Sequence, residues 1–108
     1  MGRPYLGEFE ELVLLAVAVL DGSAYGVSIA AELKHRTDRS ISLSGIHIAL
    51  YRLEEKGFVS STLGGATTAR GGRRKRLFAI TAAGKETLRD MRQIRNELWD
   101  AIPTPSWS

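Results

Sequence analysis

Residues 42–57 (SLSGIHIALYRLEEKG) have the clearest pattern of apolar and polar positions in the chain. Apolar residues recur there at helical spacing and predict one buried face: Ile46, Ala49, Leu50 and Leu53. We expect Ser44 to cap this helix, Leu43 and Ile48 to form a hydrophobic staple, and Gly57 to end the helix. The opposite face mixes polar, aromatic and basic side chains: Ser44, His47, Ile48, Tyr51 and Arg52. The same pattern also fits a helix that only covers a core, so the function of this helix must be inferred together with the neighbouring segments.

A strongly apolar helix is predicted near the start of the chain. Residues 1–7 are expected to form a loose arm, and the helix to begin near Gly7 or Glu8 and continue to Leu20. Its apolar positions cover more than one stripe, so we expect burial on two sides, by its own domain and by a second chain.

A second helix is expected over about residues 24–37, where apolar residues recur at every fourth position. Ser23 is its expected N-cap. Residues 40–43 alternate between polar and apolar side chains and predict a very short strand.

Two strands are predicted over residues 58–63 and 74–80. The loop between them, residues 64–72 (GGATTARGG), is rich in glycine and lacks large apolar side chains, so it should be exposed. Two strands joined by such a loop, directly after a helix-turn-helix pair, predict a wing.

A last helix is expected from a cap at Thr81 to about Ala101, because Pro103 and Pro105 prevent its continuation. At roughly 1.5 Å per residue it would be about 30 Å long, more than one small domain needs. Its apolar seam therefore needs a partner, most simply the same seam of a second copy, and we predict a homodimer. The predicted interface comprises Phe9, Leu12, Val13 and Ala16 of the first helix and Leu88, Met91, Ile94, Leu98, Trp99 and Ile102 of the last.

The order helix, helix, short strand, helix, hairpin is that of a winged helix-turn-helix. The predicted fold class is therefore mainly α with a small antiparallel β wing (α+β), followed by a C-terminal dimerisation helix. We expect residues 1–81 to form the winged helix-turn-helix domain, with its first helix also contributing to the dimer. Residues 82–102 would be the dimerisation helix and residues 103–108 a flexible tail.

Charge is distributed unevenly along the chain. Lys and Arg number 15 against 12 Asp and Glu, a formal net charge of only +3. Five basic residues nevertheless gather in one segment, and a local basic patch on a protein of low net charge indicates a polyanionic partner. Alternatively, these charges would only keep an exposed edge strand soluble. The patch lies in the predicted wing and contains Arg70, Arg73, Arg74, Lys75 and Arg76 without an acidic residue.

Several other classes of protein lack support in the sequence. Without cysteine there is no disulfide framework or thiolate zinc site. The longest apolar run, residues 12–20, is too short to span a bilayer, and acids precede it where a signal peptide would be positive. His47 has no acidic or histidine partner at the spacing of a metal site, and the only other histidine, His35, is distant. No hydroxyl side chain is accompanied by a base that would make it a nucleophile. We expect a cytoplasmic protein with no membrane partner, metal, cofactor or enzymatic activity.

The chain resembles the PadR-like transcriptional regulators, a winged-helix group of bacterial repressors, over about residues 6–98. Order and spacing carry the resemblance rather than any single motif, and the single C-terminal helix is similar to the family's short subclass. The matching pieces are residues 11–15 (ELVLL), 24–26 (AYG), 50–57 (LYRLEEKG), 70–72 (RGG), 76–78 (RLF) and 80–81 (IT), and Gly84.

The resemblance implies a dimer in which each last helix packs on the partner's first helix. It also implies third helices in adjacent major grooves and wings along the flanking backbone. The chain departs from the family pattern at His47, where tyrosine is usual, and at Ile48, where proline or threonine is common. We expect backbone docking to survive this change, whereas base contacts of relatives do not carry over.

We therefore expect a homodimeric repressor that binds an inverted-repeat operator in double-stranded DNA. The major groove would be contacted by Ser44, Gly45, His47, Ile48, Tyr51 and Arg52, and the phosphates by Arg70, Arg73, Arg74, Lys75 and Arg76. Trp99 would pack in the dimer core or, as the resemblance implies, stack on a small planar aromatic effector that relieves repression. The competing interpretation is a winged helix used for protein contact or for single-stranded nucleic acid.

Overall fold

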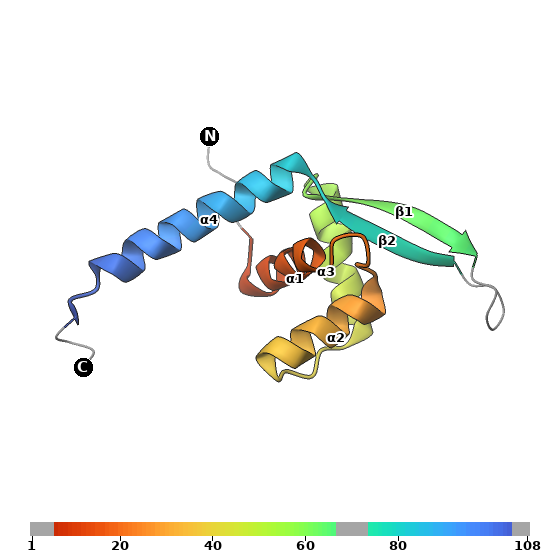
Figure 1. Cartoon of the computed structure of the whole chain (residues 1–108), viewed down its shortest axis with the longest axis horizontal. Helices are drawn as coiled ribbons and strands as arrows, with labels where there is room; N and C mark the ends of the chain where they lie inside the picture. The colour runs from red at the N-terminus through yellow and green to blue at the C-terminus, as the bar shows by residue number, and fades with distance from the viewer. Residues whose placement is uncertain (1–5, 67–73, 105–108) are drawn as a thin grey trace.

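The computed structural model describes residues 6–66 and 74–104, apart from the side chains of residues 65, 66 and 74. These residues form a winged helix-turn-helix followed by a C-terminal helix, which confirms the predicted fold class (Figure 1). The elements are α1 (Glu8–Val19), α2 (Gly26–Thr37), α3 (Leu43–Glu55), β1 (Val59–Ala66), β2 (Arg74–Ile80) and α4 (Ala82–Ala101).

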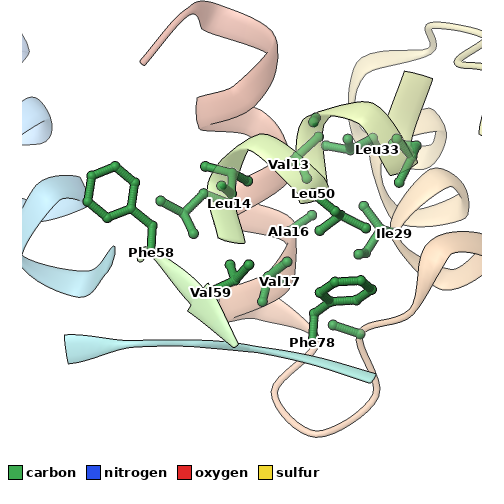
Figure 2. Packing of buried hydrophobic residues seen from close by; sticks show 14 of the residues in the cluster. Val13, Leu14, Ala16, Val17, Ile29, Leu33, Leu50, Phe58, Val59 and Phe78 are labelled. Carbon is green, nitrogen blue, oxygen red and sulfur yellow. The ribbon is translucent and has the colours of Figure 1, made fainter. Parts of the chain in front are cut away.

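Helix α1 lies at the centre of the hydrophobic core. Its side chains Val13, Leu14 and Val17 are at most 1% exposed, and each buried side chain of this kind stabilises the fold by about 1.5–3 kcal/mol. Leu6, which the sequence placed in a loose arm, is 0% exposed because it completes this core. Figure 2 shows the side chains around α1: Ile29 and Leu33 of α2, Leu50 of α3, and Phe58, Val59 and Phe78.

Helix α3 begins earlier than predicted. Ser42 is its N-cap, and the Ser42 Oγ accepts a hydrogen bond of 3.1 Å from the backbone N–H of Gly45. Ser44 lies inside the helix, so the predicted Ser44 cap is wrong. The predicted staple is wrong as well, since Leu43 and Ile48 are 44% and 56% exposed. The C-terminal stop is confirmed, because Gly57 follows the helix with a φ of +81°.

The start of α2 also differs from the prediction. The helix begins at Gly26, and its N-cap residue Tyr25 donates its backbone N–H to Ser28 Oγ at 3.0 Å. Ser23 contributes only its carbonyl oxygen, which accepts a hydrogen bond of 2.7 Å from the same hydroxyl. The predicted Ser23 cap is therefore wrong, because Ser28 supplies the polar group from inside the helix.

Strands β1 and β2 form an antiparallel hairpin with Leu63 opposite Arg76. The second edge of β2 is partly covered by the segment before α2, since Phe78 donates its backbone N–H to the Ala24 carbonyl at 2.8 Å. Residues 40–43, predicted as a short strand, are not part of a strand. A short segment joins a sheet only where a strand lies beside it. Here the segment with Ala24 lies beside β2 and pairs with Phe78.

Helix α4 begins at a junction built around Thr81. The Thr81 Oγ1 accepts a hydrogen bond of 3.1 Å from Gly84 N, which confirms the predicted cap, and donates one of 2.7 Å to the Gly57 carbonyl. Gly84 has no space for a side chain, because a Cβ there would lie 2.3 Å from the Phe58 carbonyl oxygen. The junction thus ties the end of α3, the hairpin and α4 together.

From this junction α4 extends away from the other helices (Figure 1). Leu88 and Met91 pack against the core, whereas Leu98 and Trp99 are 66% and 64% exposed. The radius of gyration of 16.3 Å exceeds the ~13 Å of a compact chain of this length. None of the helices in residues 6–66 and 74–104 combines the length and apolar character needed to cross a bilayer.

Candidate nucleic-acid interface

The outer face of α3 presents the side chains that the sequence assigned to a DNA groove. Opposite them the helix is anchored, since Ile46 and Leu53 are 0% exposed and Ala49 and Leu50 nearly so. Ile48 and Tyr51 are exposed by 56% and 66%, and Gly45 is half-buried. We use the term recognition face for the exposed residues Ser44, His47, Ile48, Tyr51 and Arg52.

His47 lies at the flank of the recognition face that adjoins α2. A Cβ on Gly26 would be 2.9 Å from both Cε1 and Nε2 of His47, and 3.1 Å from Cδ1 of Leu43. Glycine at the first position of α2 therefore lets the imidazole pack against the helix-turn-helix. The described part of the chain contains no cluster of three or more His, Cys, Asp or Glu side chains suited to a metal ion.

Arg52 lies at the other flank, beside the first turn of α1. Glu10 Oε1 accepts from Lys56 Nζ at 2.7 Å, and Glu10 Oε2 lies 3.8 Å from Arg52 Nη1. Both cations at the C-terminal end of α3 thus pair with Glu10, an acid that lies far from them in the sequence. The Glu10 side chain is only 15% exposed, so solvent screens these pairs less than it would a fully exposed ion pair.

Two of the cations predicted for the wing, Lys75 and Arg76, lie in its described part. Lys75 Nζ lies 4.3 Å from the centroid of the Tyr25 ring, a cation–π contact that joins β2 to the start of α2. Arg76 Nη1 donates to Ser61 Oγ at 3.0 Å, and that hydroxyl donates to Glu54 Oε2 at 2.8 Å. Both cations are exposed. The predicted phosphate contacts Arg70 and Arg73, and the side chain of Arg74, lie outside the described residues.

We use the term apolar surface for two groups of exposed apolar side chains, one on α1 and one on the distal half of α4. On α4 it contains Ile94, Leu98 and Trp99, exposed by 46%, 66% and 64%, with Ile102 half-buried beside them. On α1 it contains Leu15 and Val19, exposed by 41% and 55%.

The outward residues of α1 differ from those predicted for a dimer. Of the predicted residues, Val13 and Ala16 are 0% and 3% exposed and pack inside their own chain. Phe9 and Leu12 are half-buried against the same core. The apolar positions of α1 cover more than one stripe, so the sequence alone did not show that Leu15 and Val19 are the exposed ones.

Comparisons with known proteins agree on one family. The family model described as Transcriptional regulator PadR-like family matches residues 14–90, most of the chain. Among curated protein sequences, no significant match to the chain was found.

Solved structures share the fold at low sequence identity. A PadR family transcription regulator from Clostridium difficile R20291 has a TM-score of 0.72 at 22% identity, covering 89% of this chain and 95% of that one. A PadR-like transcriptional regulator from Bacillus cereus has a TM-score of 0.73 at 19% identity, covering 93% and 92%. Bacillus subtilis PadR, solved in complex with operator DNA, has a TM-score of 0.62 at 22% identity, covering 78% of this chain and 46% of that one. The chain belongs to the PadR-like family of transcriptional regulators.

Proposed function

We propose that the chain regulates transcription by binding double-stranded DNA as a homodimer, and that it represses a promoter through an inverted-repeat operator. The observation that carries the proposal is the recognition face, which is exposed on a helix whose opposite side is fixed in the core. In helix-turn-helix proteins, a helix anchored in this way presents its exposed side chains to a major groove. The complex of Bacillus subtilis PadR with operator DNA supports double-stranded DNA as the ligand.

The wing would hold the flanking backbone. Lys75 and Arg76 are exposed on β2, and the remaining cations of the predicted patch adjoin them in sequence. Phosphate contacts position a protein on the duplex and make its affinity dependent on salt. Replacing Arg76 should therefore weaken binding to all duplexes rather than to one sequence.

The homodimer is proposed from the exposed apolar surface on α1 and α4. Half of α4 extends beyond the core with Leu98 and Trp99 exposed, and a helix without tertiary contacts is marginally stable in water. The same surface of a second copy would cover these side chains and place two α3 helices on the two halves of an operator. A planar effector at Trp99 would need the partner to enclose it, because 64% of Trp99 is exposed in one chain.

Binding to DNA upstream of the chain's own gene tests the proposed function. In a fluorescence anisotropy assay, the upstream duplex should compete far better than a random duplex or a single strand of the same length. Size-exclusion chromatography should give the mass of a dimer, and Leu98→Glu should convert it to a monomer, whereas Leu63→Glu in β1 should not. A monomeric protein without preference for any duplex would favour the alternative, a winged helix for protein contact or single-stranded nucleic acid.

A further inference from the structure

Helix α3 lacks most of the side chains that recognise purines by paired hydrogen bonds. In the major groove, Arg or Lys contacts guanine through two acceptors, and Asn or Gln contacts adenine through one donor and one acceptor. Helix α3 (LSGIHIALYRLEE) contains no Asn, Gln or Lys and a single Arg, Arg52. If this helix distinguishes bases, it must rely largely on other contacts.

The residues at the flanks of the recognition face make contacts within the protein although they are exposed. Arg52 lies 3.8 Å from Glu10 on one flank. On the other flank His47 packs against Gly26, and Glu54 accepts the hydroxyl of Ser61 at 2.8 Å. These contacts leave the middle of the face to residues 44, 48 and 51, which succeed one another at helical spacings of four and three.

Ile48 is the apolar member of this central row. Its side chain is 56% exposed, is branched at Cβ and is therefore rigid about χ1. It follows Ser44 by one helical turn, in the half of the helix that begins at the cap Ser42. Ser44 and Tyr51 carry hydroxyl groups, which bind phosphate oxygens as well as base edges, whereas Ile48 has no hydrogen-bonding group.

The major groove offers one apolar group that distinguishes bases, the C5-methyl group of thymine. We propose that Ile48 is a specificity-determining residue that selects thymine in each half-site through contact with this methyl group. The inference rests on the proposed function, since it requires α3 to enter a major groove. Burying one methyl group against Ile48 should change affinity about fourfold, from the transfer free energy of one CH₂ group.

Replacing thymine by deoxyuridine tests the contact, because uracil lacks only the C5-methyl group and keeps the pairing and the hydrogen-bonding edges. The probe is the consensus duplex that the full chain enriches from a random library of duplexes, with each thymine replaced in turn. Wild-type affinity should fall about fourfold at one thymine per half-site, and replacement elsewhere should have little effect.

Two variants locate the effect on the protein. Ile48→Ala should bind the thymine and uracil duplexes equally, with unchanged helix content by circular dichroism, because Ile48 faces solvent and alanine favours helices. Leu63→Ala, which removes another exposed apolar side chain on β1, should keep the wild-type difference between thymine and uracil.

The possible failures are distinguishable. Wild-type binding that is insensitive to uracil at every position, or an Ile48→Ala variant that keeps the full difference, would overturn the inference and leave the proposed function standing. Loss of the dimer in Ile48→Ala would also overturn it, since the side chain would then serve a protein contact. A wild-type chain that enriches no duplex would overturn the proposed function and, with it, this inference.

Discussion

Glu11 and Arg95 join α1 to α4 through an ion pair in which Glu11 Oε1 lies 2.5 Å from Arg95 Nη2. The Glu11 side chain is 9% exposed and the Arg95 side chain 59%. The pair lies where α4 changes from a helix packed on the core at Met91 to a helix exposed at Leu98. It therefore ties α4 to α1 beyond the packing of Met91 on the core.

Replacing Arg95 by Ala should lower the free energy of unfolding by about 1 kcal/mol, the scale of a partly solvated ion pair. The cost arises because the Glu11 carboxylate would remain nearly buried without its cation. Urea unfolding monitored by circular dichroism measures it as a lower midpoint. Combining Arg95→Ala with Glu11→Gln should recover part of the loss, and an unchanged midpoint in the single variant would show that the pair contributes nothing.

Replacing Gly26 by Ala should change DNA binding more than stability. The new methyl group would meet the far end of the His47 ring and the Leu43 side chain, both of which can move without disturbing the backbone. We expect a change in unfolding free energy within about 1 kcal/mol and a several-fold loss of affinity for the consensus duplex. Thermal unfolding and anisotropy titration measure the two effects. A large fall in melting temperature with unchanged affinity would contradict the assignment of His47 to the recognition face.

Replacing Glu10 by Gln should strengthen binding to every duplex. Without the carboxylate charge, Arg52 and Lys56 would be available to phosphates, so the salt dependence should steepen by about 0.9 in log–log slope for each added phosphate contact. Titrations over a series of salt concentrations measure this slope. Glu32→Gln is the matched control, because it makes the same change in net charge but its partner Arg36 lies beside it on α2. Equal effects of the two variants would mean that net charge alone is responsible.

Replacing Gly84 by Ala should destabilise the fold by about 3 kcal/mol. The added Cβ would lie 2.3 Å from the Phe58 carbonyl oxygen and 2.8 Å from Ile80 Cγ1, so the first turn of α4 must move away from the hairpin. Denaturant unfolding measures the loss. The control is Ala83→Ser at an exposed position of the same turn, which should change stability by less than about 0.5 kcal/mol. A Gly84→Ala protein as stable as the control would mean that the junction adapts without strain.

Local patterns predicted the helices, the hairpin and which side of α3 is exposed. The spacing of apolar residues in α3 separated buried Leu50 from exposed Tyr51, because helical period alone determines which residues share a face. The cap at Thr81 and the stop at Gly57 were also predictable, since each depends on the backbone geometry of a few consecutive residues.

Contacts between distant segments were not predictable in this way. The acids at the start of α1 form ion pairs across elements, Glu8 with Arg39 at 3.3 Å and Glu10 with Lys56 at 2.7 Å. Nothing in the spacing of one segment identifies such partners. The outward position of Leu15 was missed for the same reason, since packing of the other elements decides which side of an apolar helix is covered.

The junction at Thr81 has a consequence for operator geometry. Thr81, Gly57 and Gly84 hold the start of α4 against the end of α3 and the root of the wing, so the direction of α4 relative to the recognition face is set within each chain. In the proposed dimer, the partner's α3 is positioned through α4. The angle at this junction would then determine how many base pairs separate the two half-sites, and substitutions there would select operators of different spacing without touching a base.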